Sequence, residues 1–381
     1  MTRFALTGAR IFDGETMHDR MAAVIANGMI EAVMPAHQLD SMVPSIDLKG
    51  GVLAPGFIDA QVNGGGGVLL NEDPSVEVIA RMAQAYRVFG TTSLLPTVIT
   101  DRTDIIRDAA NAVAAARREG VPGILGIHIE GPFLDPARRG AHPPEHIRPI
   151  TPDDVTWLKT LDCGIVLLTV APSHVAPETI RDLAQAGIII SLGHSDATAA
   201  QANAALAAGA RGFTHLYNAM SQLQHREPGM VGAALADRDS YCGIIADGHH
   251  VNPVALQVAL AAKPRGRIFL VTDAMPPAAG GPASFELQGR KITVHNGRLE
   301  LDAGTLAGSI LTMDQAVRYC VEVLHVDLAE ALRMASLYPA AFLRLDRQLG
   351  RIAPGYRANL VHLTAGLAVT RTWIEGVAFP S

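Results

Sequence analysis

The chain has 381 residues, of which 49% are hydrophobic and 18% are charged, and its formal net charge at pH 7 is −6. This length and composition allow one large domain or two ordinary domains with a sizeable buried core. The sequence contains no cluster of Lys and Arg that would indicate binding to a polyanion, so nucleic acid is not an expected partner. It also contains no apolar run that approaches the ~20 residues of a membrane span, so a membrane is not an expected partner either.

The cysteines point to a reducing compartment. Cys163, Cys242 and Cys320 follow no pairing pattern and form no CxxC motif, which also argues against a thiolate zinc site. The N-terminus lacks the apolar core of a signal peptide. We therefore expect a cytoplasmic protein.

The two ends of the chain have the same character. Residues 1–53 hold short apolar segments separated by turn signals such as Asn27-Gly28, and residues 350–381 repeat this pattern. Neither end can bury a core alone. We predict one small β-sandwich domain formed from both termini, with residues 54–349 as a second domain between them.

Between the two ends, short apolar strands alternate with helical segments. The eight predicted strands cover residues 52–58, 92–98, 124–129, 165–170, 188–192, 212–215, 241–246 and 267–271. The clearest predicted helices cover residues 75–88, 101–118, 177–186, 197–208 and 253–262, followed by a long helical tail at 313–343. This alternation over roughly 300 residues predicts an α/β fold, a (β/α)8 TIM-type barrel. An open doubly wound sheet is the structural alternative.

Polar residues end several of these strands, which favours the barrel because its strand ends share one active-site face. Glu130 ends the third strand, His194 the fifth and His215 the sixth. Two imidazoles and a carboxylate form a catalytic zinc ligand set that leaves the fourth position to a water, whose pKa then falls towards neutrality. Asp273 ends the eighth strand, where it could take the proton of that water.

Each of these residues also has a simpler interpretation. A single His at a strand end is more often a structural hydrogen-bonding group, and Glu130 could be a buried acid satisfied by the backbone. Their joint occurrence at equivalent positions of several strands favours the metal site. His128 faces the same side of its strand as Glu130, and we expect it one layer deeper, either as barrel filling or as a support of the ligands, and not as a ligand itself. The glycines at 64–67 fit either a phosphate cradle or a flexible loop.

Several segments are similar to motifs of a known family. They are Pro55-Gly-Phe-Ile-Asp59, Glu130-Gly-Pro-Phe133, Gly193-His-Ser195, Thr214-His-Leu-Tyr-Asn-Ala-Met220, Asp247-Gly-His-His250 and Val271-Thr-Asp-Ala274. These segments resemble the N-acetylglucosamine-6-phosphate deacetylase branch of the amidohydrolase superfamily, and the resemblance covers nearly the whole chain. It implies metal-dependent hydrolysis of N-acetyl-D-glucosamine 6-phosphate to D-glucosamine 6-phosphate and acetate, in amino-sugar catabolism. The metal would lie on Glu130, His194 and His215, with a bound water as nucleophile and Asp273 as general base and acid.

The resemblance also implies a site for the phosphorylated amino sugar. Its residues would be Ala141, His142, Asn218, Ala219, Arg226, His250, Leu306, Ala307 and Gly308. Arg226 and His250 would hold the 6-phosphate, one of them reaching across the interface of a homodimer, and His142 would donate a hydrogen bond to the oxyanion. Without the resemblance, the expected role of Arg226 is a surface ion pair with Glu227 or Asp237.

One segment departs from the superfamily. Most amidohydrolases carry His-x-His after the first strand, whereas this chain has Gln61-Val-Asn63. Amides are poor zinc ligands beside imidazole and carboxylate. We therefore expect one divalent metal ion per subunit, and zinc is the expected ion, while Fe2+, Co2+ or Mn2+ would also suit the ligands.

Two other functions stay open at this point. The chain could be a different amidohydrolase, such as an N-acyl-amino-acid deacylase or a cyclic amidase. It could also be a non-catalytic, amidohydrolase-like assembly protein. Such a protein would be expected to lack metal ligands or the acid of the eighth strand, and this chain has both.

Overall fold

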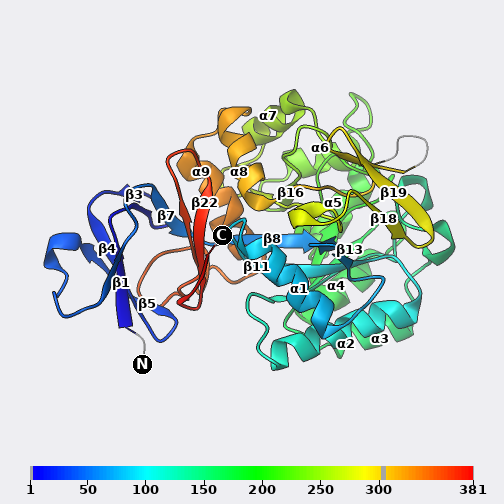
Figure 1. The fold of residues 1–381 in the computed structure, drawn as a ribbon. Coiled ribbons are helices and arrows are strands. Elements are labelled where there is room, and N and C mark those ends of the chain that lie inside the picture. The colour runs from blue at the N-terminus through cyan, green and yellow to red at the C-terminus, as the bar shows by residue number, and fades with distance from the viewer. Residues whose placement is uncertain (1–2, 302–305, 381) are drawn as a thin grey trace.

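A computed structural model of the chain describes residues 3–301 and 306–380. Eight parallel strands form one sheet in the order β17-β16-β15-β14-β13-β12-β11-β8 (Figure 1). These strands are β8 (Phe57–Val62), β11 (Thr91–Ile99), β12 (Gly126–Glu130), β13 (Ile165–Val170), β14 (Ile189–Leu192), β15 (Gly212–Phe213), β16 (Tyr241–Ile244) and β17 (Ile268–Leu270). A bridge between Val62 and Ala274 connects the two edges of the sheet. The predicted barrel is therefore confirmed.

Helices follow most of the strands and cover the outside of the barrel (Figure 1). They are α1 (Val76–Arg87), α2 (Thr103–Arg118), α3 (Pro152–Lys159), α4 (Pro177–Gln185), α5 (Ala199–Ala207), α6 (Gly229–Ala236) and α7 (Pro253–Ala262). Every residue of β11 is buried, as expected of a parallel strand covered on both faces. On α2, the buried residues Ile106, Ala109, Val113 and Ala116 recur at helical spacing, so one stripe of this helix packs against the barrel. No helix in the described part of the chain is long and apolar enough to span a membrane.

Both termini contribute strands to a second, β-rich region. One sheet holds β1 (Arg3–Thr7), β4 (Met21–Ala26), β5 (Met29–Pro35) and β6 (Ser45–Asp47). The other holds β2 (Arg10–Phe12), β3 (Met17–His18), β7 (Val52–Pro55), β21 (Leu360–Leu363), β22 (Val369–Ile374) and β23 (Val377–Pro380). Trp373 is fully buried and packs with Leu6, Ile25 and Leu53. The core of this region thus draws on both ends of the chain.

The predicted strand at 52–58 is wrong in one respect, because it spans two strands in different sheets. Its first part is β7, which pairs with β21, and its last residues begin the barrel strand β8. The chain passes from one sheet to the other at Gly56. A Cβ there would lie only 2.2 Å from Thr92 Oγ1, so the crossing point has no room for a side chain. Apolar character continues through both strands and hides this break in the sequence.

Two further elements differ from the predictions. The strands β18 (Ser284–Leu287), β19 (Arg290–His295) and β20 (Arg298–Glu300) form an antiparallel sheet after the last barrel strand, which the sequence did not predict. The predicted tail at 313–343 is three helices, namely α8 (Met313–Glu322), α9 (Leu328–Ala335) and α10 (Leu337–Phe342).

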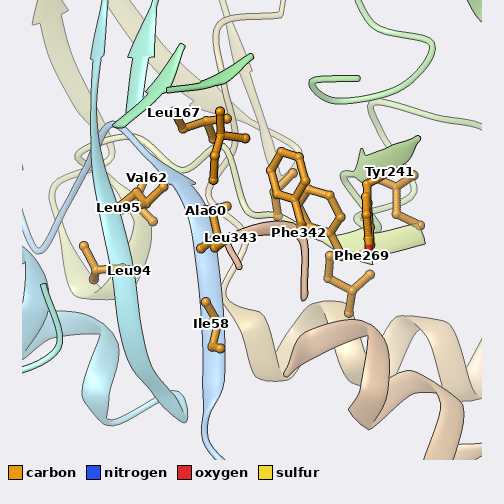
Figure 2. Close-up of a cluster of buried hydrophobic side chains, with 14 of the residues drawn as sticks. Ile58, Ala60, Val62, Leu94, Leu95, Leu167, Tyr241, Phe269, Phe342 and Leu343 are labelled. Atoms are coloured by element: carbon orange, nitrogen blue, oxygen red, sulfur yellow. The ribbon is translucent and has the colours of Figure 1, made fainter. Parts of the chain in front are cut away.

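The last of these helices supplies a plug for the barrel. Figure 2 shows Phe342 beside Phe269 and Tyr241. The centroid of its ring lies 4.7 Å from that of Phe269, in a stacked arrangement, and 5.7 Å from that of Tyr241, in a tilted one. Phe342 is 1% exposed. Gly212 makes room for it, since a Cβ on Gly212 would lie 2.8 Å from the Phe342 ring. Through Phe342, α10 thus packs against β15, β16 and β17, three of the barrel strands.

We predict that Phe342→Ala lowers the free energy of unfolding by about 3–5 kcal/mol, because it removes a large buried ring and leaves a cavity. Phe342→Leu keeps most of the volume and should cost less than about 2 kcal/mol. Urea unfolding followed by circular dichroism measures both values. Equal losses for the two variants would contradict the assigned role of the ring as a plug.

Candidate active site

Three side chains meet at the carboxyl ends of neighbouring strands. Glu130 is the last residue of β12, while His194 and His215 each follow two residues after their strands, β14 and β15. Glu130 Oε1 lies 3.2 Å from His194 Nε2 and 3.0 Å from His215 Nε2, and the two Nε2 atoms are 3.0 Å apart. All three residues are buried. Among the described residues, they form the one group of three or more side chains able to hold a metal ion.

The backbone leaves the strand conformation at the residues that carry these groups. His194, His215 and Asp273 have φ angles of 46°, 34° and 52°, in the left-handed region that residues with a Cβ rarely adopt. Such strain persists only where the surrounding structure holds it, and it concentrates at functional sites. Two metal-ligand candidates and the candidate base share this feature.

The orientation of His194 fits a metal ligand. Its Nδ1 lies 3.0 Å from the carbonyl oxygen of Arg138, which can only accept, so Nδ1 donates and carries the proton. Metal binding requires a neutral imidazole, and the Nε2 lone pair would then face the same point as Glu130 Oε1, which lies 3.2 Å away. A divalent ion would suit this donor set, because two imidazoles and a carboxylate are the ligands of catalytic zinc sites. The residues present therefore fit a divalent metal ion.

The charge of Glu130 supports the same conclusion. Burial by itself raises the pKa of this carboxyl group. The hydrogen bonds and charges of His194 and His215 outweigh burial and hold the Glu130 pKa well below its usual range. The carboxylate is consequently ionised and ready to bind a cation.

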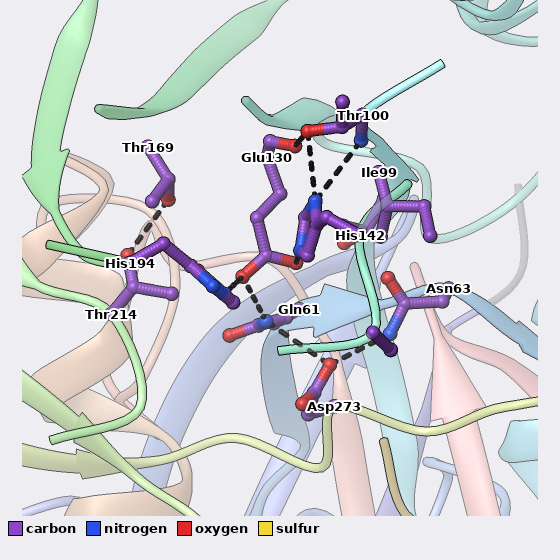
Figure 3. A network of polar contacts seen from close by, with 12 residues as sticks. Gln61, Asn63, Ile99, Thr100, Glu130, His142, Thr169, His194, Thr214 and Asp273 are labelled. Carbon is purple, nitrogen blue, oxygen red and sulfur yellow. Dashed lines mark hydrogen bonds and ion pairs between the residues drawn. The ribbon is translucent and has the colours of Figure 1, made fainter. Parts of the chain in front are cut away.

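Gln61 and Asn63 act as hydrogen-bond donors around Asp273 (Figure 3). Gln61 Nε2 donates to Glu130 Oε1 and to Asp273 Oδ1, both at 3.1 Å, and Asn63 Nδ2 donates to Asp273 Oδ1 at 2.7 Å. Burial and the charge of Glu130 raise the pKa of Asp273 to about 6, while the Asn63 hydrogen bond acts in the opposite direction. The Gln61 amide thus links the two carboxylates, while the Asn63 amide contacts Asp273 alone.

His142 turns one nitrogen towards this cluster and the other away from it. Its Nδ1 accepts a hydrogen bond from the Thr100 backbone N–H at 3.3 Å and lies 2.8 Å from Thr100 Oγ1 (Figure 3). Burial and the charge of His194 lower the pKa of His142 well below its usual value, so the ring is neutral. Because Nδ1 accepts, the proton sits on Nε2, which lies 4.0 Å from Glu130 Oε2. His142 therefore presents an N–H donor to the site.

A cavity of about 330 Å³ opens onto these groups. The predicted residues that line it are Glu130, His142, His194, His215, Asp273, Ala141, Asn218, Ala219, His250, Leu306 and Gly308. The ring of His250 is fixed by Asp247, whose Oδ2 lies 2.7 Å from Nδ1. The structure thus gathers most of the residues that the resemblance implied into one pocket.

Two predicted residues do not line this cavity. Ala307 is fully buried in an apolar cluster with Ile99, Met275 and Leu299. Arg226 lies on an exposed loop before α6, and none of the ion pairs among the described residues involves it. The surface ion pair that was the alternative for Arg226 is therefore not formed.

The remaining candidates are His128 and the glycines at 64–67. His128 lies outside the ligand group, and its ring nitrogens contact Thr97 Oγ1 at 3.2 Å and Thr169 Oγ1 at 2.8 Å. The glycines at 64–67 do not form a free N–H cradle. The N–H groups of Gly64, Gly66 and Gly67 donate to carbonyl groups of the segment that follows β17.

Sequence reasoning missed several residues of the pocket wall. They are Ile99, Ala137, Arg138, Gly140 and Met275. Three of them belong to the segment between Glu130 and α3, which contains only short 3-10 turns and gives no periodic signal. Thr100 was also missed, because a Thr that follows an apolar strand has no distinguishing pattern.

Comparisons with known proteins agree with this geometry. The profile of the amidohydrolase family matches residues 52–378, and that of the NagA composite domain matches residues 3–53. An N-acetylgalactosamine-6-phosphate deacetylase of Shewanella sp. (strain ANA-3) is 45% identical, over 97% of this chain and 94% of that protein. An N-acetylglucosamine-6-phosphate deacetylase of Haemophilus influenzae is 39% identical, over 98% of each chain.

A solved structure shows the same similarity in three dimensions. The N-acetylglucosamine-6-phosphate deacetylase of Pasteurella multocida is 36% identical and superimposes with a TM-score of 0.97, over all of both chains. The family profile covers far more than half of the sequence, and the relatives match over nearly its whole length. The chain therefore belongs to the amidohydrolase family.

Proposed function

We propose that the chain hydrolyses the acetamido group of N-acetyl-D-glucosamine 6-phosphate, giving D-glucosamine 6-phosphate and acetate. The observation that carries this proposal is the meeting of Glu130, His194 and His215 in one cavity with Asp273. The names of the relatives support the substrate class. N-acetyl-D-galactosamine 6-phosphate is a second candidate substrate, because the Shewanella relative acts on that epimer by its name.

Glu130, His194 and His215 would hold one divalent ion, and we propose zinc. Two imidazoles and one carboxylate are a catalytic zinc ligand set, which Fe2+, Co2+ and Mn2+ can also use. When bound, such an ion polarises a carbonyl group and lowers the pKa of a water. Gln61 and Asn63 donate their amide hydrogens to carboxylates, which agrees with one ion and not two.

Two side chains of the pocket would move or hold the reacting hydrogens. Asp273 accepts a proton from the attacking water and then delivers it to the nitrogen of the departing amine. Its pKa of about 6 suits both steps near neutral pH. His142 donates from Nε2 to the oxygen of the acetamido group as negative charge develops there. The tie from its Nδ1 to Thr100 fixes that direction.

The sugar and its phosphate would occupy the rest of the cavity. Asn218, Ala219, His250, Leu306 and Gly308 belong to the wall of the cavity. We propose that His250 and Arg226 bind the 6-phosphate. Because Arg226 is exposed and does not line the pocket of its own chain, it would enter the site of a second copy, in a cytoplasmic homodimer. The apolar side chains of Leu223, Val254 and Val258 are 54%, 65% and 50% exposed, which suits such an interface.

Two alternative functions are less well supported. A cyclic amidase or an N-acyl-amino-acid deacylase would share the metal ligands but would have no use for a phosphate site at Arg226 and His250. A non-catalytic assembly protein would not need Asp273 to be held by two amides beside an ionised ligand group.

We expect acetate release from N-acetyl-D-glucosamine 6-phosphate with about one metal ion per chain. The unphosphorylated sugar should be a poorer substrate by roughly 10²-fold or more in kcat/KM, since it lacks the contacts to the phosphate. The same assay on the galactosamine epimer decides between the two candidate substrates. Equal kcat/KM for phosphorylated and unphosphorylated sugars would overturn the phosphate proposal and favour another amidohydrolase activity.

Asp273→Asn should lower kcat by roughly 10²–10⁴-fold, because an amide cannot accept the proton. Its metal content, measured by atomic spectroscopy, should stay at the wild-type level. His194→Ala should lose the metal and the activity together. His128→Gln is the matched control, since His128 lies below the ligand group, and it should keep the metal. Near-wild-type turnover of Asp273→Asn would show that another group moves the proton.

Hybrid dimers test whether Arg226 acts across an interface. Asp273→Asn and Arg226→Ala are each expected to be nearly inactive as homodimers at low substrate concentration. A hybrid of the two variants would contain one pocket with both Asp273 and Arg226 if Arg226 comes from the other copy. With random assembly, about a quarter of all pockets would regain activity. No recovery in isolated hybrid dimers would place Arg226 in its own site or outside the reaction.

A further inference from the structure

We propose that the sheet of β18, β19 and β20 positions His142, with Gln288 and Arg290 as positioning residues for the hydrolysis. The inference rests on the proposed function, because it concerns the donor His142. Neither Gln288 nor Arg290 lines the cavity. Arg290 contacts the backbone of Ala141, the residue before His142. Gln288 contacts the backbone of Thr100, the residue that holds the His142 ring.

The first contact fixes the peptide that precedes His142. Arg290 Nη2 donates to the carbonyl oxygen of Ala141 at 2.6 Å. Ala141 itself lines the cavity, and it lies in a segment that has no regular strand or long helix. A hydrogen bond from a charged donor is among the stronger ties that a protein can make to a carbonyl group. Arg290 therefore limits the movement of the backbone that carries His142.

The second contact fixes the residue that holds the His142 ring. Gln288 Nε2 donates to the carbonyl oxygen of Thr100 at 3.0 Å and to Asp101 Oδ2 at 2.7 Å. The N–H of the same residue, Thr100, donates to His142 Nδ1, and its Oγ1 lies 2.8 Å from that atom. Thr100 thus contacts Gln288 through its carbonyl oxygen, and the His142 ring through its N–H and Oγ1. Figure 3 shows the contacts between Thr100 and His142.

The sheet is packed firmly enough for this role. Leu287, Ile292 and Leu299 are fully buried against Ile99 and Met275, two residues of the cavity wall. Gln288 stands at the tip of the β18–β19 hairpin, with a φ of 50° followed by 75° at Gly289. Two consecutive left-handed residues are the conformation of the tight two-residue hairpin turn. The turn itself thus aims the Gln288 amide at Thr100.

The two contacts act on the direction of one N–H group. An oxyanion donor contributes to catalysis only where it lies close to the developing charge, and a displacement of about 1 Å can cost up to 10²-fold in rate. Thr100 orients the ring of His142 and Ala141 places its backbone. Removal of either tie should therefore lower kcat and leave the metal ligands in place.

The first test compares single variants. Arg290→Ala and Gln288→Gly should each lower kcat by roughly tenfold, with KM changed by less than about twofold and metal content unchanged. Glycine is chosen at Gln288 because it tolerates the φ of 50°. Lys291→Ala is the matched control, since Lys291 is the exposed neighbouring cation on β19, and it should keep wild-type kcat. Wild-type kcat in both test variants would overturn the proposal.

The second test separates positioning from general damage. In a His142→Ala background, Arg290→Ala should change kcat by less than about twofold, because the group it positions is gone. A further tenfold loss in that background would show that Arg290 acts elsewhere, and would overturn the inference. Arg290→Lys keeps a cationic donor and should recover part of the loss, which covers the case in which Arg290→Ala does not fold.

Failure of the proposed function gives a different result. In that case the wild-type chain releases no acetate from either hexosamine 6-phosphate, while its metal content is normal. If the wild-type chain is active and the Gln288 and Arg290 variants match it, only the positioning role is wrong.

Discussion

One ionised carboxylate oxygen meets two imidazole nitrogens at 3.0–3.2 Å in a buried space, and the active-site end of the barrel depends on this contact. A buried carboxylate is costly unless it is paired and hydrogen-bonded. Three strands supply the three groups, so each strand must end at the same level of the barrel. A shift of one residue in β12 would turn Glu130 away from the interior, because successive side chains point to opposite faces. The fold and the metal chemistry therefore impose the same register.

The amides of Gln61 and Asn63 stabilise two carboxyl groups, those of Glu130 and Asp273, that lie close together. Glu130 and Asp273 are both acids, and two like charges close together raise the pKa of at least one of them. An amide NH2 group can donate to both acids while adding no charge of its own, as Gln61 does. The result is an ionised Glu130 beside an Asp273 whose pKa is about 6. An acid with a pKa in this range can both accept and return a proton near neutral pH.

The sequence was sufficient to predict the barrel, in which strands and helices alternate regularly. Eight apolar strands alternated with helices, and three of them ended in Glu130, His194 and His215, so both the barrel and the ligand group were predictable. The break at Gly56 was missed although Pro55-Gly56 is a turn signal, because the apolar character of β7 continues into β8 on the other side of it. The sheet of β18–β20 was also missed. Its few buried residues, Leu287, Ile292 and Leu299, are spread over three short strands and give no sustained pattern.

A division of labour between strands and loops explains why the chemistry was easier to predict than the selection of substrate. In the proposed function, the metal ligands and Asp273 act on the acetamido group, which both candidate hexosamine 6-phosphates share. These two sugars differ only at the C4 hydroxyl, so discrimination between them must come from other parts of the wall. That wall is built from Ala219, Met275, Leu306 and their neighbours, which follow strands or lie in loops. Loop positions are set by contacts between distant segments, as Arg290 and Ala141 show, and no local spacing in the sequence encodes such contacts.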